Sequence, residues 1–235
     1  MKKILLALLT IYCVSAHAQK FKERPGGQLS IGARSTMSLF TDENGNGNGI
    51  GGHIRLRLLN HLNTEWFADY LNSTVAEGLG TRQDYHIGWS VMFYPPFAYF
   101  NNKRYVPQPY FIAGHCFDYT RVASNNPVHP SEASRWSSAI QGGLGFHIPL
   151  TKRIDFTTTA QYMMHLGNVI EADVRTNAAT NVNYIYVDTA PRAGLEGHLL
   201  VTCSMNFMLV DLWRNKIKGV QDGKPEDNEP DAVGY

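Results

Sequence analysis

The sequence predicts an all-β fold, an eight-stranded antiparallel up-and-down transmembrane β-barrel over residues 28–209. Three observations favour this fold: eight segments alternate apolar and polar side chains, an export leader precedes them, and short turns alternate with long polar connections. A period of two gives a strand one apolar and one polar face. An even strand number with short turns at one end and long loops at the other is typical of barrels that span a membrane.

The composition excludes several classes of protein. The 235 residues carry 21 Lys and Arg against 20 Asp and Glu, a net charge of +1, so no basic surface is available to bind nucleic acid. The hydrophobic fraction of 43% is too high for a disordered chain, and three cysteines are too few for a disulfide scaffold.

Residues 1–18 have the features of a signal peptide. Lys2 and Lys3 precede an apolar run over residues 4–14, and Ala16 and Ala18 form a small-x-small cleavage site. The run is shorter than the roughly 20 residues needed to span a bilayer. We therefore expect cleavage after Ala18, export of the chain, and a short periplasmic lead over residues 19–27.

The first four predicted strands have clear faces. In residues 28–40, odd positions such as Leu29 and Ile31 are apolar and even positions such as Ser30 are polar. The same contrast recurs in residues 53–58, 62–70 and 84–93. Each segment therefore predicts a strand with one apolar face.

Four further strands are predicted over residues 110–120, 136–148, 154–166 and 198–207. The segment 110–120 is ambiguous because both of its faces carry apolar residues. We place His115 inward, since an uncharged face towards lipid costs less, which puts Cys116 on the outer face. Cys116 and Cys203 would then lie on the outer faces of non-adjacent strands, so we expect free thiols.

The connections between the segments set the orientation. Residues 59–61 and 151–153 form short turns, whereas residues 41–49, 73–83, 122–135 and 168–192 are long and polar. Apart from the Pro-rich link over residues 95–109, the long loops emerge at one end, which we assign to the outside, and both termini lie in the periplasm. Two aromatic girdles are expected at the two rims: Tyr70, Tyr85, Trp136 and Tyr162 above, and Phe93, Phe146, Phe156 and Phe207 below.

Three runs resemble a known family. GGQLSIGARSTMSLF, QPYFIAGHCFDY and IQGGLGFHIPLTKRIDFTTTAQYMMHLG are similar to the small outer-membrane β-barrel superfamily of the outer-membrane protein A and X type, a porin-family barrel domain. The resemblance covers Gln28 to Leu209 and implies the outer membrane of a Gram-negative-type bacterium. That superfamily holds adhesion proteins, narrow pores, anchors and a few lipid-modifying enzymes. This chain differs because 28 residues follow Phe207, and we expect a polar acidic periplasmic tail over residues 210–235.

Charged residues on the predicted inward faces form the main candidate site, a barrel-interior network of Arg34, Arg55, Arg57, Glu65 and Asp69. If Leu58 opposes Leu62 across the turn, counting back places Arg55 opposite Glu65. Eight strands leave room for side chains and little water, so this network is expected to plug the lumen. The alternative is a gated narrow channel for small solutes.

No metal or cofactor is expected. Several inward positions carry possible ligands, namely His86, His147, His165, His198, Asp84 and Asp155. None of them has the HxxxH or HExxH spacing that brings ligands together on one element, so we interpret them as interior filler.

A partial calcium-loop pattern spans Asp42 to Asn48. Asp42, Asn44 and Asn46 occupy the first, third and fifth places, but the twelfth place is His53 instead of Glu. Strands are also expected on both sides where a calcium loop has helices. A flexible Gly/Asn surface loop is the preferred interpretation, and calcium binding stays open.

The resemblance includes lipid A deacylases, which carry a His-x-Ser pair near the outer rim. The corresponding stretch here is His165-Leu166-Gly167, so the nucleophile position has no side chain. Ser137 and Ser138 on the neighbouring strand could in principle substitute, but nothing in the spacing requires it. We therefore expect no enzyme.

The sequence thus favours a non-enzymatic barrel with an envelope or surface interaction role. A narrow channel is the alternative, a lipid-acting enzyme is less favoured, and a soluble barrel also stays open. Expected partners are outer-membrane lipid and an unidentified extracellular or periplasmic protein, with no nucleic acid, and the expected state is a monomer.

Overall fold

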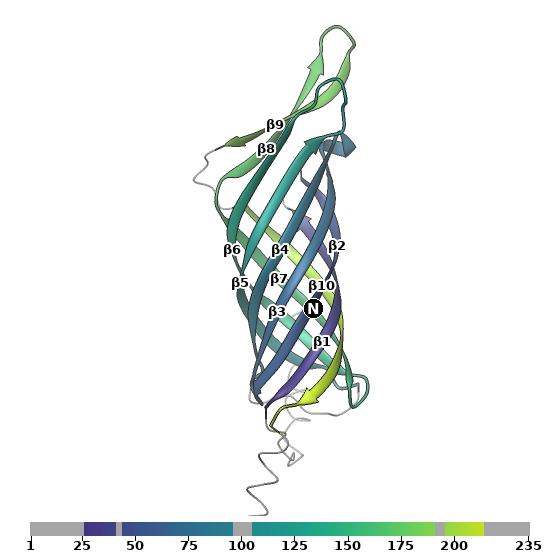
Figure 1. Ribbon diagram of the computed structural model, residues 1–235. Helices are drawn as coiled ribbons and strands as arrows, with labels where there is room; N and C mark the ends of the chain where they lie inside the picture. Colours follow the sequence, from purple (N-terminus) through teal and green to yellow (C-terminus); the bar gives the residue numbers. More distant parts are fainter. Residues whose placement is uncertain (1–25, 41–43, 96–104, 191–195, 214–235) are drawn as a thin grey trace, which may run out of the picture.

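The computed structural model describes residues 26–40, 44–95, 105–190 and 196–213. Within them, eight antiparallel strands form one closed barrel, and two more strands form a separate hairpin (Figure 1). The predicted fold class is confirmed. The barrel strands are β1 Gln28–Phe40, β2 Asn44–Leu59, β3 Leu62–Val75, β4 Gly80–Phe93, β5 Gln108–Ser124, β6 Glu132–Pro149, β7 Ile154–Leu166 and β10 Glu196–Asp211. The hairpin consists of β8 Val169–Asn177 and β9 Val182–Ala190.

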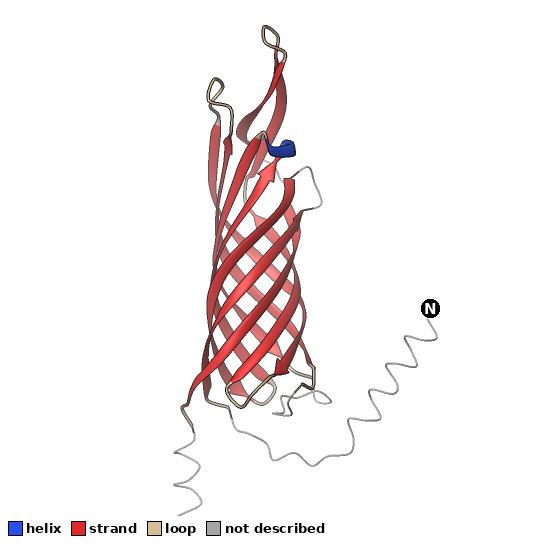
Figure 2. Cartoon of the chain, turned by 90° about the vertical axis from the view of Figure 1, so that its right-hand side faces the viewer, coloured by secondary structure: helices blue, strands red, loops and turns tan. Residues whose placement is uncertain are grey.

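The barrel closes where its first and last strands pair. Gln28 lies opposite Asp211, and the ring order is β1-β10-β7-β6-β5-β4-β3-β2. The strands are steeply tilted, so near and far walls cross in projection (Figure 2). No helix among the described residues is long and apolar enough to cross a membrane. The expected signal peptide, residues 19–25 of the lead and residues 214–235 of the tail lie outside the described residues.

The two faces of the wall differ as the alternation predicts. Outward side chains include Trp136, which is 76% exposed, whereas the inward Arg55 and Asp118 are 3% and 0% exposed. Successive ring contacts connect Tyr70 to Tyr85 at 5.0 Å, Tyr85 to Tyr119 at 6.1 Å and Tyr119 to Trp136 at 4.9 Å. All of these except Tyr119 were predicted as girdle residues. The described outer surface therefore carries an aromatic row near one rim.

The faces of β5 are the reverse of those predicted. Cys116 is fully buried in the interior, while His115 lies on the outer face and bonds the hydroxyl of Ser138. Asp118 shares a face with Cys116, and a carboxylate on the outer face would cost far more than an imidazole with a hydroxyl partner. The acid therefore decides the orientation of the strand. Both cysteines are free, as expected, but only Cys203 is exposed.

The predicted long loops are shorter than expected because the strands continue into them. Residues 73–83 shrink to a connection over residues 76–79, which includes the 3₁₀ turn η2 Ala76–Gly78, and residues 122–135 shrink to 125–131. The connection 168–192 holds the β8–β9 hairpin. Strands of 13 to 18 residues exceed the roughly 9–11 needed to cross a bilayer, so the excess extends the barrel wall beyond the bilayer.

The Gly/Asn segment is also strand, against the loop prediction. Asn44–Gly49 belongs to β2, with Gly47 facing inward and Asn46 and Asn48 outward. The alternation of glycine with asparagine is therefore a period-two pattern. An extended strand cannot wrap its side chains around one ion, so residues 44–48 do not form a calcium loop; Asp42 lies outside the described residues.

The turn after β2 contains a bulge. Leu59, not Leu58, pairs with Leu62, and the register shifts between Arg57 and Leu59. The bulge absorbs one residue, so Arg55 still lies directly opposite Glu65. The predicted pair is confirmed although the predicted turn partner of Leu62 was wrong.

Candidate functional site: the barrel interior

The structure brings Arg55 and Glu65 together near the short-turn end of the lumen. Arg55 Nη2 donates to Glu65 Oε2 at 2.6 Å, and Arg55 Nη1 lies 3.6 Å from Asp155 Oδ1 on β7. Asp155 also accepts from Asn206 at 2.6 Å and lies 3.4 Å from His147 Nε2. These contacts link β2, β3, β6, β7 and β10 across the interior.

Two other predicted residues join the same network. Arg34 on β1 donates to Glu65 Oε1 at 3.0 Å, and its Nε lies 3.0 Å from Asp69 Oδ1. Arg57 donates to Gln28 at 3.0 Å. All five residues predicted for the network are buried, and four of them are joined by ion pairs.

A second charged cluster, which was not predicted from the sequence, lies towards the end of the lumen opposite the short turns. Arg82 on β4 donates to Glu196 on β10 at 2.7 Å and to both oxygens of Asp84 at 3.0–3.1 Å. Arg135 on β6 contacts the other oxygen of Glu196 at 2.5 Å. In the ring order, β4 and β10 are four strands apart in either direction, so the Arg82–Glu196 pair joins opposite walls.

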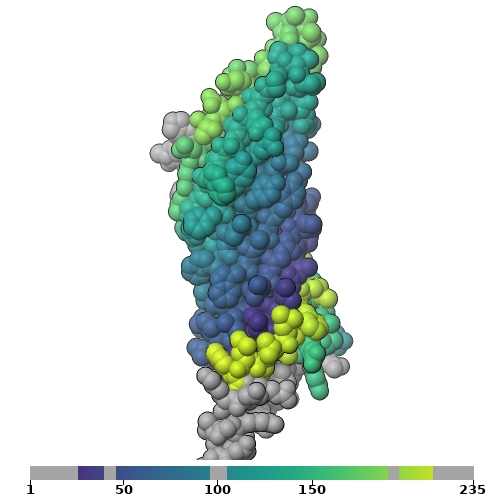
Figure 3. Space-filling model, viewed as in Figure 1, coloured from purple at the N-terminus to yellow at the C-terminus, as the bar shows by residue number. Residues whose placement is uncertain are grey.

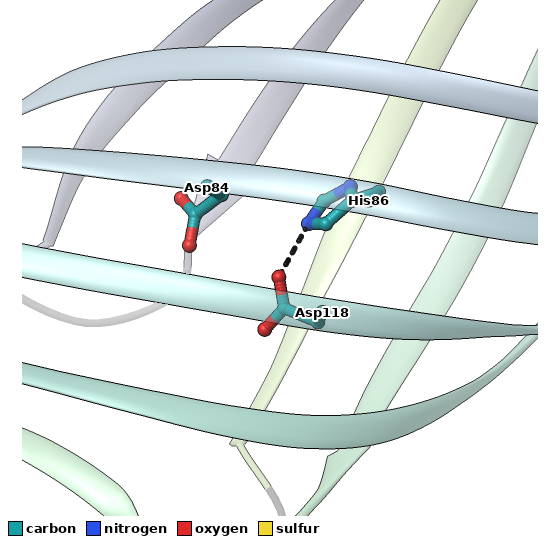
Figure 4. Close-up of side chains that lie close together, drawn as sticks. All are labelled: Asp84, His86 and Asp118. Carbon is teal, nitrogen blue, oxygen red and sulfur yellow. Dashed lines mark ion pairs between the residues drawn. The ribbon is translucent and has the colours of Figure 1, made fainter.

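Beside this cluster, Asp84, His86 and Asp118 converge from adjacent strands (Figure 4). His86 lies directly opposite Asp118 in the β4–β5 register, and their Nε2 and Oδ1 atoms are 3.1 Å apart. His165 Nδ1 on β7 lies 3.1 Å from the other oxygen, Asp118 Oδ2. The Asp84-x-His86 spacing can be recognised in the sequence. Asp118 could not be recognised as a third member, because the predicted faces of β5 placed it outward.

Apolar and aromatic side chains fill the lumen between and below the charged clusters. A central group consists of Phe67, Leu71, Cys116, Ala139, Met163 and Leu200. Towards the short-turn end, Tyr94 and Tyr110 are 0% and 1% exposed, and the Tyr110 hydroxyl bonds Thr159 at 2.5 Å. The interior is thus packed at several levels, and the outer wall is continuous on the side seen in Figure 3.

The β8–β9 hairpin covers part of the end of the barrel opposite the short turns. Ile185 and Val187 pack with the inward side chains Val75 and Val122 in one buried apolar cluster. Ser131 Oγ accepts from the Val187 amide at 2.8 Å and donates to its carbonyl at 3.2 Å, which fixes the hairpin to the connection between β5 and β6. Apolar packing and the hydrogen bonds of the Ser131 hydroxyl together hold this segment in place.

The serines considered for hydrolysis do not form a catalytic triad. Ser137 Oγ and Asp118 Oδ2 both lie by the same nitrogen of His165, Nδ1, at 3.4 and 3.1 Å. A triad needs the acid on one ring nitrogen and the nucleophile on the other. Ser138 lies on the outer face and bonds His115.

A closed barrel with an apolar exterior and a charged, packed interior is the architecture of outer-membrane β-barrel proteins. The family defined as the outer membrane protein beta-barrel domain matches residues 4–185, and this chain belongs to that family. It is therefore a protein of the outer membrane.

Solved structures with a similar fold share little sequence with this chain. Outer membrane protein OprG from Pseudomonas aeruginosa is 14% identical with a TM-score of 0.47, covering 81% of this chain and all of that one. Neisserial surface protein A is 14% identical with a TM-score of 0.45, covering 77% and 97%. The attachment invasion locus protein of Yersinia pestis is 16% identical with a TM-score of 0.37, covering 78% and 99%. No curated protein matches the chain.

Proposed function

We propose that this chain is a non-enzymatic, non-conducting outer-membrane protein that presents the β8–β9 hairpin at the cell surface. The observation that carries the proposal is the Arg82–Glu196 pair, which joins opposite walls of the barrel at 2.7 Å. A solute would have to separate this buried pair to pass, and a buried charge left without its partner costs about 3–5 kcal/mol. The Arg55–Glu65 network adds a second barrier below it.

A surface role is supported by the β8–β9 hairpin, which extends beyond the barrel strands. Val174, Val182 and Tyr186 are 40–52% exposed on the hairpin, and Arg175 stacks over the Tyr186 ring at 3.9 Å. Exposed apolar and aromatic side chains on an ordered hairpin favour contact with another macromolecule. In this proposal the partner is an extracellular protein, the outer wall contacts lipid as a monomer, and residues 1–18 are removed on export.

The test is single-channel conductance in a planar bilayer. We expect folded wild-type protein, identified by heat-modifiable gel mobility, to produce no conductance steps. The double variant Arg82→Ala/Glu196→Ala removes the spanning pair and should allow brief openings. The matched variant Arg121→Ala/Glu132→Ala removes an exposed pair of the same 2.7 Å length and should stay silent.

Steady conductance of the wild-type protein would overturn the closed-lumen proposal and establish the narrow channel instead. Release of fatty acid from lipopolysaccharide by the purified protein would overturn the non-enzymatic assignment. In that case Ser137→Ala identifies whether the serine beside His165 is responsible.

A further inference from the structure

We propose that Asp84, His86 and Asp118 form a binding site for a divalent transition metal ion, of which Zn²⁺ is the best fit. One ligand atom from each residue lies within 4.8 Å of the others, and all three residues are at most 2% exposed. Metal–ligand bonds of about 2.0–2.2 Å require only small side-chain rotations to bring these atoms around one ion.

The contact between His86 and Asp118 has the distance of an ion pair but not the direction of a hydrogen bond. His86 Nε2 and Asp118 Oδ1 are 3.1 Å apart, yet neither atom has a hydrogen-bond partner among the described residues. Buried polar atoms are rarely left unpaired, because each costs about 1–3 kcal/mol. Two lone pairs directed at a shared cation would satisfy both atoms.

The charge around Asp118 supports a cation at this position. Arg82 donates to both oxygens of Asp84, one of the proposed ligands, and also to Glu196, and Arg135 contacts Glu196. An ion would therefore share the Asp84 carboxylate with Arg82. Within the described part of the chain, the ion-pair partners of the Asp118 carboxylate are the imidazoles of His86 and His165. A buried carboxylate without a guanidinium or ammonium partner favours a bound cation.

The surrounding bonds hold the three ligands in place. Thr120 Oγ1 lies 2.7 Å from Asp84 Oδ1 and 3.0 Å from Asp118 Oδ2, and can donate to either carboxylate. Ser137 donates to Asp118 Oδ2 at 3.2 Å, and His165 approaches the same oxygen. These outer contacts leave Asp118 Oδ1 available and resemble the supporting shell of known metal sites.

The ligand types select the class of ion. One imidazole nitrogen and two carboxylate oxygens suit Zn²⁺, with water completing four-fold coordination. Ca²⁺ takes six to eight oxygen ligands, which this cluster cannot provide. The site is independent of the proposed surface role, so zinc binding and conductance are separate readouts.

The experiment measures zinc on protein prepared without a histidine tag. Protein purified in detergent is unfolded in urea and refolded with Zn²⁺, so that the closed lumen does not block entry, and is then desalted. We expect about one Zn²⁺ per folded chain. His86→Gln and Asp118→Asn should weaken binding at least tenfold in competition with a chromophoric chelator. His147→Gln is the matched control, because it alters a buried histidine beside Asp155 at the other end of the lumen.

The proposal is overturned if folded wild-type protein retains no zinc, if folded His86→Gln or Asp118→Asn binds as tightly as wild type, or if His147→Gln loses zinc equally. Should the variants fail to fold, X-ray absorption of zinc-loaded wild-type protein decides. A first shell of oxygen and a single imidazole supports the site, whereas sulfur or several imidazoles contradicts it.

Discussion

Arg34 on β1 and Asp69 on β3 form an ion pair across the strand that separates them. Arg34 lies opposite Gly51 in the β1–β2 pair, and Gly51 lies opposite Asp69 in the β2–β3 pair, so the three residues lie in one row across the strands. Gly51 has no side chain, and a Cβ built there would lie 1.9 Å from Asp69 Oδ1. The absence of one side chain thus permits the 3.0 Å contact between its two neighbours.

Gly51→Ala should therefore destabilise the barrel. The new methyl would lie 1.9 Å from Asp69 Oδ1 and also 2.3 Å from the backbone oxygen of Ala68, so both the Arg34–Asp69 pair and the neighbouring backbone must shift. Overpacking of this kind costs about 1–3 kcal/mol. Urea unfolding in detergent, followed by heat-modifiable mobility, measures the loss. Gly52→Ala is the control, since its Cβ would point outward and meet only a carbonyl at 3.5 Å. Equal effects of the two substitutions would contradict the role of the row.

Buried and exposed ion pairs should respond differently to the loss of one charge. Glu65→Gln leaves Arg34 and Arg55 without their shared carboxylate and should cost about 3–5 kcal/mol of unfolding free energy. Glu132→Gln breaks an exposed pair with Arg121, which solvent screens, and should produce no measurable change. A stable Glu65→Gln variant would show that the interior network contributes little to folding.

The two cysteines should differ in their accessibility to a lipid-soluble maleimide. Cys203 is exposed on the outer wall, whereas Cys116 is buried in the lumen beside Met163. In folded protein reconstituted into bilayers, mass spectrometry should find label on Cys203 only, and Cys203→Ser should abolish labelling. Label on Cys116 would show that this residue faces outward, as the alternation pattern had predicted.

The ends of the barrel should differ in their access to reagents outside the cell. Ala179 is exposed at the tip of the β8–β9 hairpin, and Lys152 is exposed in the turn between β6 and β7. On intact cells, a membrane-impermeant maleimide should label Ala179→Cys but not Lys152→Cys, which should react only after the outer membrane is permeabilised. The reverse pattern would invert the topology.

Most of the barrel was predictable because alternation is local. The two faces of β1, β3 and β7 follow from side chains two residues apart, and the Arg55–Glu65 pair follows from counting back across one turn. The length of the extension was not predictable, since polar residues such as Asn46 and Asn48 suit a loop and an exposed strand equally. Pairing with neighbouring strands decides between the two.

The interior contacts depended on closure of the ring. The sequence by itself determined that a polar face would be enclosed and that Arg34, Arg55, Glu65 and Asp69 would share it. Only the tertiary structure decided that Arg82 meets Glu196 across the lumen, because residues 114 positions apart come together only when the last strand pairs with the first. The tertiary structure also decided the orientation of β5. Both faces of this strand carry apolar residues, so the pattern alone did not fix it, and the high cost of placing Asp118 in lipid turns that face inward.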